Sequence, residues 1–161
     1  MNPLRSFGFL LRDVSRLYVR RFEQRAAALG LTLPQCRALV YLALNEGISQ
    51  ARLAELTDVE PMTLVRILDR MASDGWLERR VDSVDRRARC IYLKPKAKPL
   101  VDDIWELAEL TRQEAFLGIP KRQVGVLITM LDQVRNNLAT LEPLSTAPTT
   151  RPRRERSSAQ P

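Results

Sequence analysis

The chain has 161 residues and a net charge of +7, is 45% hydrophobic and 6% aromatic, and contains only six glycines, which favours a mainly α-helical protein with an anionic partner. It has no histidine and two cysteines. His-dependent catalysis is therefore excluded and two cysteines alone cannot form a zinc site, so we expect no enzyme, no metal and no cofactor. No apolar run is long enough to span a membrane, and the N-terminus lacks a signal-peptide pattern. We therefore expect a cytoplasmic protein that does not interact with membranes.

The first third of the chain predicts two helices. Apolar side chains recur at three- and four-residue spacing over 4–29, which indicates a long amphipathic helix that ends at Gly30. This helix presents one apolar face, formed by Phe7, Leu10, Leu11, Val14, Leu17, Tyr18 and Phe22. A second helix is predicted over 33–45, with Pro34 in its first turn, where a missing N–H is tolerated.

Two shorter helices and a hairpin follow. Ser49 is an expected N-cap for a helix over 50–56, and a turn leads to a helix over 61–74 that begins at Pro61. The second of these helices buries a single stripe, made of Leu64, Ile67, Leu68 and Met71. Two β segments are then predicted, 76–81 and 89–93, joined by a turn over 82–88.

Two further helices are predicted, over 95–117 and 120–142. The second carries an a/d seam that implies packing against a long partner helix, formed by Val124, Leu127, Leu131, Val134, Leu138 and Leu141. This seam and the long first helix cannot both be covered within one compact monomer, so a homodimer is expected. The chain from 143 on has no aromatics and four arginines against one glutamate, and a disordered basic tail is predicted there.

The helix over 61–74 and the hairpin after it indicate DNA binding. The exposed face of the helix is predicted to carry Met62, Thr63, Arg66, Asp69, Arg70 and Ser73, and such a face fits the major groove, although an ordinary solvated face has the same composition. Residues 79–98 hold eight cations against two acids, a local net charge of +6: Arg79, Arg80, Arg86, Arg87, Arg89, Lys94, Lys96 and Lys98 against Asp82 and Asp85. A cluster of one sign favours contact with phosphates, and arginines are attracted to a narrow minor groove.

The order short helix, turn, helix and hairpin resembles the winged helix-turn-helix core of the MarR family of transcriptional regulators, and within it most closely the SlyA branch. The family's wing motif is matched by Asp85, Arg87, Ala88 and Leu93. The resemblance covers about residues 5–142, with two departures after the wing, at Lys94 and Lys98, where the family usually has threonine and glycine. It implies a mainly α fold with a two-stranded wing and long N- and C-terminal dimerisation helices.

The resemblance also implies roles for individual residues. Met62, Thr63 and Arg66 would read bases, with Arg70 on the same face. Arg86 and Arg87 would enter the minor groove, with Asp85 shaping the wing. Ser49 and Gln50 would contact phosphate. The dimerisation residues would be those of the two apolar faces named above: Phe7, Leu10, Leu11, Val14, Val124, Leu127, Leu131, Val134, Leu138 and Leu141.

These roles divide the chain into four segments: a dimerisation helix (1–32), a DNA-binding domain (33–94), C-terminal dimerisation helices (95–142) and a basic tail (143–161).

Regulation leaves several alternatives open. A small aromatic carboxylate is the ligand class that the resemblance suggests, and a pocket for it could be lined by Trp76, Trp105, Tyr41 and Phe116, which otherwise serve as packing residues. A thiol-based redox response is the other possibility. For that response Cys90, predicted to face away from the core next to arginines, is a better candidate than Cys36, predicted to be an inert core thiol.

Three functions are compatible with the sequence. The leading one is a homodimeric regulator that binds a pseudo-palindromic site in double-stranded DNA, as a repressor that occludes a promoter or as an activator that displaces another repressor. A nonspecific architectural DNA-binding protein is the second, and a winged-helix module that binds only proteins is the third. The local charge of +6 at the hairpin argues against the third.

Overall fold

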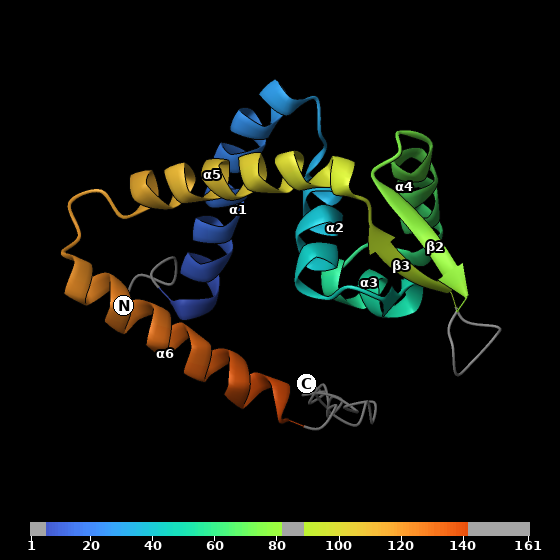
Figure 1. Cartoon of the computed structure of the whole chain (residues 1–161). Helices are drawn as coiled ribbons and strands as arrows, with labels where there is room; N and C mark the ends of the chain where they lie inside the picture. Colours follow the sequence, from blue (N-terminus) through green and yellow to red (C-terminus); the bar gives the residue numbers. More distant parts are fainter. Residues whose placement is uncertain (1–5, 82–88, 142–161) are drawn as a thin grey trace, which may run out of the picture. The chain divides into compact units, whose positions relative to one another are not determined.

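The computed structural model describes residues 6–81 and 89–141, and its packing divides the chain into two units, Met1–Leu117 and Gly118–Pro161. The described part of the first unit contains five α-helices. It also contains a small antiparallel sheet (Figure 1). The second unit contains one described helix, α6 (Lys121–Ala139). The helix that follows the hairpin belongs to the first unit, because it packs on the first and second helices of the chain.

Helix α1 (Phe7–Ala26) continues into a 3₁₀ turn (Ala27–Leu29) and ends at Gly30, whose φ of 67° is in the left-handed region that glycine adopts without strain. Helix α2 (Leu33–Leu44) begins with a capping box, in which Thr32 and Gln35 satisfy backbone donors at the helix start. Both helices were predicted within a few residues.

Helices α3 (Gln50–Thr57) and α4 (Pro61–Ser73) form the helix-turn-helix. Leu64, Leu68 and Met71 of α4 are fully buried, and Ile67 is half-buried, as the stripe predicted. Leu53 of α3 is also fully buried, and α3 packs on α2 and α4. The burial of this stripe fixes which face of α4 remains in solvent.

The sheet has three strands in the order β1-β3-β2, all antiparallel, with β1 at Ile48–Ser49, β2 at Leu77–Val81 and β3 at Arg89–Leu93. Two of the strands were predicted. The third, β1, has only two residues, too few for an alternating pattern to be detected in the sequence. It pairs Ile48 with Ile91 and Ser49 with Cys90, so β3 is the central strand.

Helix α5 (Lys98–Ala115) follows a 3₁₀ turn (Pro95–Ala97) and packs along α1. An ion-pair cluster joins the two helices. Arg21 donates to Glu114 from Nε (2.7 Å) and from Nη2 (3.0 Å), and Arg25 forms an ion pair with the same carboxylate. The hydrogen bonds from Arg21, followed by those from Arg25, lower the pKa of Glu114 to about 2.

Across residues 6–81 and 89–141, no single helix has both the length and the apolar content of a membrane span. One pair of helices, Phe7–Leu29 and Leu33–Leu44, meets that test together, by length and composition only, with a bend of 87° between them.

The depressed pKa of Glu114 makes the α1–α5 joint sensitive to acid. The carboxylate contributes stability above its unfolded pKa of about 4.3, and this contribution is lost as the pH falls toward about 2. Urea unfolding at pH 6 should therefore show Glu114→Gln to be less stable than wild type, with the difference shrinking at pH 3.5. Arg21→Gln is the partner control and should show part of this loss at pH 6, because Arg25 still pairs with Glu114. A difference between wild type and Glu114→Gln that is equal at both pH values would contradict the assignment.

Candidate nucleic-acid interface

The outer face of α4 is the centre of the candidate interface. Met62, Thr63, Arg66 and Arg70 are all exposed, and Met62 has 63% of its surface in solvent although it is apolar. The helix starts at Pro61 with Glu60 as N-cap, whose carboxylate Oε2 accepts a hydrogen bond from the Thr63 N–H at 2.8 Å. Hydrogen bonds from the backbone of Met62 and Thr63 lower the pKa of Glu60, so it is ionised at neutral pH.

Helix α3 presents a differently capped N-terminus. Ser49 is the N-cap, as predicted, and its hydroxyl accepts a hydrogen bond from the Arg52 N–H at 3.2 Å. Gln50 follows as the first helical residue and is half-buried. A neutral cap leaves the helix dipole and free N–H groups available to an anion. The phosphate contact expected for Ser49 and Gln50 stays a prediction.

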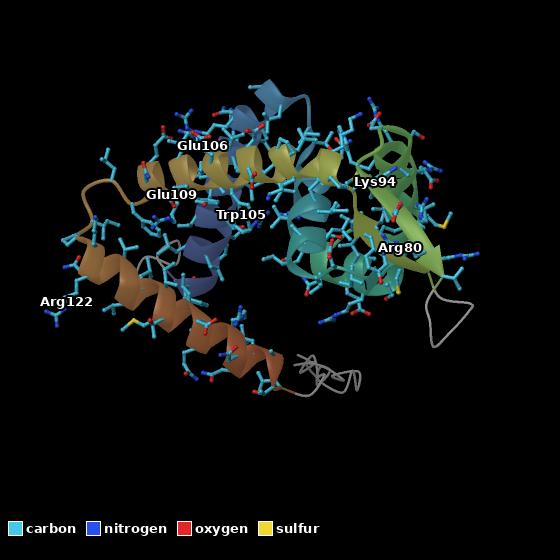
Figure 2. The ribbon with its side chains drawn as sticks, in the orientation of Figure 1. Arg80, Lys94, Trp105, Glu106, Glu109 and Arg122 are labelled. Carbon is cyan, nitrogen blue, oxygen red and sulfur yellow. The ribbon has the colours of Figure 1, made fainter. Side chains whose placement is uncertain are left out.

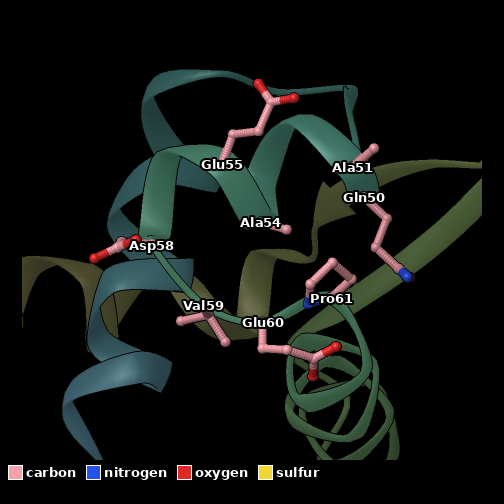
Figure 3. A pocket seen from close by; sticks show the side chains of 8 residues that line it. All are labelled: Gln50, Ala51, Ala54, Glu55, Asp58, Val59, Glu60 and Pro61. Atoms are coloured by element: carbon pink, nitrogen blue, oxygen red, sulfur yellow. The ribbon is translucent and has the colours of Figure 1, made fainter. Parts of the chain in front are cut away.

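The turn between α3 and α4 sets the direction of α4. Asp58 ends α3 with a φ of 53°, the one positive φ among the described non-glycine residues. Aspartate tolerates this conformation better than most residues do. Thr57 is buried, and its hydroxyl donates to the Leu53 carbonyl at 2.7 Å. An open groove of about 520 Å³ runs along the turn, and Glu55 and Glu60 extend from opposite sides of it (Figure 3).

The strands of the hairpin use part of their charge within the protein. Arg79 forms an ion pair with Asp69 of α4 (Nη2–Oδ1 2.7 Å), which joins the hairpin to this helix. Arg80 contacts Glu78 (Nε–Oε1 2.7 Å) and stacks 4.3 Å from the centre of the Tyr92 ring, and Lys96 donates to the Asp74 carbonyl at 2.9 Å. Among the described cations of 79–98, Arg79, Arg80 and Lys96 therefore have internal partners, which the count of charges could not reveal.

The cations of that segment differ in position. Arg80, which has internal partners, and Lys94 lie at opposite ends of the paired strands (Figure 2). Arg89 is exposed and pairs with Val81, the last residue of β2. The predicted wing residues Asp85, Arg86 and Arg87 lie outside the described residues, so their assigned roles remain predictions.

The structure corrects the prediction for Cys90. By alternation Cys90 does lie on the face of β3 opposite to Ile91, but it is only 7% exposed. The cause is β1, which places Ser49 on one side of Cys90 while Arg80 lies on the other. Cys36 is a core residue, as predicted, and burial raises the pKa of its thiol to about 11, so the thiol stays protonated at neutral pH.

An apolar pocket of about 420 Å³ lies in the first unit, lined by residues of α1, α2 and α5. Tyr41 and Trp105 line it, as predicted, and Trp105 projects from α5 (Figure 2). Trp76 and Phe116 do not line it, and Trp76 packs against the core instead. Sequence reasoning missed two lining residues with polar groups, Tyr18 and Arg37, because only the fold brings α1 next to α2 at this point.

Apolar faces remain uncovered within each unit. Phe7, Leu10, Leu11 and Val14 of α1 are between 43% and 57% exposed. In the second unit no residue of α6 is buried, and its predicted seam is half-buried or exposed throughout: Val124, Leu127, Leu131, Val134, Leu138 and Leu141. The described residues contain no group of three or more acidic, cysteine or histidine side chains that could hold a metal ion.

A helix-turn-helix followed by an antiparallel hairpin defines a winged-helix protein. Residues 29–88 match the model of the MarR family. A structure of the transcriptional regulator PA3341 has 33% sequence identity and a TM-score of 0.75, and the match covers 84% of this chain and 100% of that one. The chain therefore belongs to the MarR family of transcriptional regulators.

Two further structures share the fold over similar lengths. A MarR-family transcriptional regulator from Silicibacter pomeroyi is 26% identical with a TM-score of 0.73, and the match covers 84% of this chain and 92% of that one. A mutant of MarR from E. coli, in complex with operator DNA, is 25% identical with a TM-score of 0.69, and the match covers 83% and 94%.

The Arg79–Asp69 ion pair can be tested by a double-mutant cycle. Arg79→Ala and Asp69→Ala should each lower the free energy of unfolding in urea, and the double variant should lose less than the sum of the two, with a coupling energy below about 1 kcal/mol because Asp69 is 59% exposed. Arg80→Ala is the matched control, since Arg80 contacts Glu78 and Tyr92 instead. Its effect should add to that of Asp69→Ala. Purely additive effects of Arg79→Ala and Asp69→Ala would contradict the link between hairpin and helix.

Proposed function

We propose that this protein is a homodimeric, sequence-specific regulator that binds a pseudo-palindromic site in double-stranded DNA. The observation that carries the proposal is the division of α4 into two faces. Its inner face is fully buried at Leu64, Leu68 and Met71, and its outer face presents polar side chains and one apolar side chain, Met62, to solvent. An α-helix fits the major groove, where arginine bonds guanine O6 and N7. An apolar group, such as methionine or the methyl of threonine, contacts the thymine methyl there.

The wing motif supports a place for the protein near the SlyA branch of the family, with Arg86 and Arg87 in the minor groove and Asp85 shaping the turn. Binding over a promoter would repress transcription, and displacement of another repressor would activate it. The cytoplasm is the location that fits a DNA-binding regulator.

A homodimer supplies the partner that the uncovered faces require. The apolar side chains of α1 and α6 described above would otherwise remain in water, at a cost of roughly 25 cal/mol for each Å². A two-fold symmetric dimer would present two copies of α4 to successive major grooves, so the half-sites should be about one helical turn apart.

The pocket supports regulation by a small aromatic carboxylate. Its volume is in the range of small-ligand sites, and Tyr18, Tyr41 and Trp105 offer aromatic surfaces. Arg37 adds a cation to the pocket and donates one N–H to the Thr57 carbonyl at 3.4 Å. Its other N–H groups are left for a carboxylate. A redox response is less well supported, because Cys36 is held as a thiol and Cys90 is buried, whereas oxidation requires an accessible thiolate.

Sequence-specific binding and nonspecific architectural binding differ in their response to Arg66→Ala. Loss of a base contact should cost ~1–3 kcal/mol on a duplex selected by the wild type and much less on a random duplex. Affinities for both duplexes are to be measured by fluorescence anisotropy at two salt concentrations. Arg112→Ala, which removes the same charge on α5 away from α4, is the control and should change neither affinity. Equal wild-type affinity for selected and random duplexes at both salts would contradict specific recognition.

Benzoate, the simplest aromatic carboxylate, probes the pocket. In a Trp76→Phe background, the fluorescence of Trp105 should change on titration with benzoate, because Trp105 lines the pocket. Arg37→Met should weaken benzoate binding roughly tenfold or more while leaving that of neutral benzyl alcohol unchanged, since only the carboxylate uses the guanidinium. Equal loss of affinity for both probes would contradict a charge-reading role for Arg37.

A further inference from the structure

The two helices of the helix-turn-helix have chemically opposite N-termini. Ser49 caps α3 with a neutral hydroxyl, whereas Glu60 caps α4 with a carboxylate. Serine, threonine, aspartate and asparagine are the usual caps, so the longer acidic side chain at the start of α4 is an uncommon choice. A capping carboxylate occupies the position where the N–H groups of a helix N-terminus would otherwise bind a phosphate. The start of α4 is therefore closed to the DNA backbone, while the start of α3 remains open to it.

The Glu60 carboxylate is fixed in place and still has acceptor capacity. Oε2 accepts the Thr63 N–H at 2.8 Å, and hydrogen bonds from Met62 and Thr63 hold it ionised. An ionised carboxylate has about four lone-pair positions and no donor, so it can accept further hydrogen bonds but cannot donate. Glu60 itself is exposed, at the end of α4 that base-reading helices direct into the groove.

The bases in the major groove offer few donors to such a group. Only the amino groups of cytosine N4 and adenine N6 donate there, and acidic side chains pair with cytosine N4. Arg66 is the exposed cation about one and a half turns further along the same helix, and arginine prefers the guanine edge. A carboxylate and a guanidinium presented by one helix therefore form a combination suited to cytosine and guanine edges.

We propose that Glu60 is a specificity-determining residue, whose carboxylate accepts a hydrogen bond from a cytosine amino group at one position of each half-site and repels phosphate from the start of α4. This inference rests on the proposed function and extends it to the N-terminus of the recognition helix. It assigns α3 to the backbone and the first turn of α4 to the bases.

Selection of bound duplexes from a random pool tests the inference with the full chain and three variants. Glu60→Gln keeps the length of the side chain and removes the charge, and Glu60→Ser keeps a capping oxygen. Glu55→Gln is the matched control, because Glu55 lies across the groove on α3 and pairs with Arg52 (Figure 3). Circular dichroism and urea unfolding confirm that each variant is folded.

The wild type should prefer cytosine at one symmetry-related position by roughly tenfold over the other bases. Glu60→Gln should change that preference to adenine, the base that glutamine bonds through N6 and N7. Glu60→Ser should lose the preference at that position alone and should bind random duplex more tightly than the wild type does. Glu55→Gln should select the same sequences as the wild type.

Three results would overturn the inference alone. The first is unchanged selected sequences for both Glu60 variants. The second is a loss of affinity in Glu60→Ser that is equal for selected and random duplexes, as expected of a helix cap only. The third is a shift in sequence preference in Glu55→Gln equal to that of the Glu60 variants. A wild type that selects no sequence at all would overturn the proposed function, and the inference with it.

Discussion

The burial of one stripe of α4 is the constraint on which the candidate interface depends. Leu64, Leu68 and Met71 are fully buried, and they fix the rotation of the helix about its own axis. Because successive residues of an α-helix turn by about 100°, this rotation also decides that Met62, Thr63, Arg66 and Arg70 are in solvent. A polar face of this kind is therefore a consequence of core packing. Its chemistry can vary without loss of the fold, which is how one architecture can serve different DNA sequences.

Polar contacts determine how the neighbouring elements are held to this helix. The Arg79–Asp69 pair joins β2 to α4, and Lys96 bonds the carbonyl of Asp74 at the end of α4. The surface ion pair contributes little to stability, about 0–1 kcal/mol. The value of both contacts is positional, since they hold the hairpin and the residues after it to α4. They also reduce the number of cations that are free to contact phosphate, so net charge overstates the basic surface available to DNA.

Helix α2 lies between the pocket and the candidate interface, since it lines the pocket and packs on α3 and α4. Arg37 lines the pocket and donates to the carbonyl of Thr57, the last residue of α3. Thr57 lies just before the turn at Asp58 that directs α4. Arg37 therefore links the lining of the pocket to the end of α3 through one side chain and one backbone carbonyl.

The sequence by itself determined the helices, the buried stripe of α4, the Ser49 cap and the core position of Cys36, because each follows from the local spacing of apolar residues or from local capping chemistry. It could not determine β1, the burial of Cys90, the partners of Arg79 and Arg80, or the full lining of the pocket. These features depend on residues distant in the chain: Cys90 is covered because Ser49 pairs with it from a remote segment, and Arg79 reaches Asp69 only when β2 lies beside α4. Periodicity reports which side of an element is apolar, whereas only tertiary packing decides what lies against the other side.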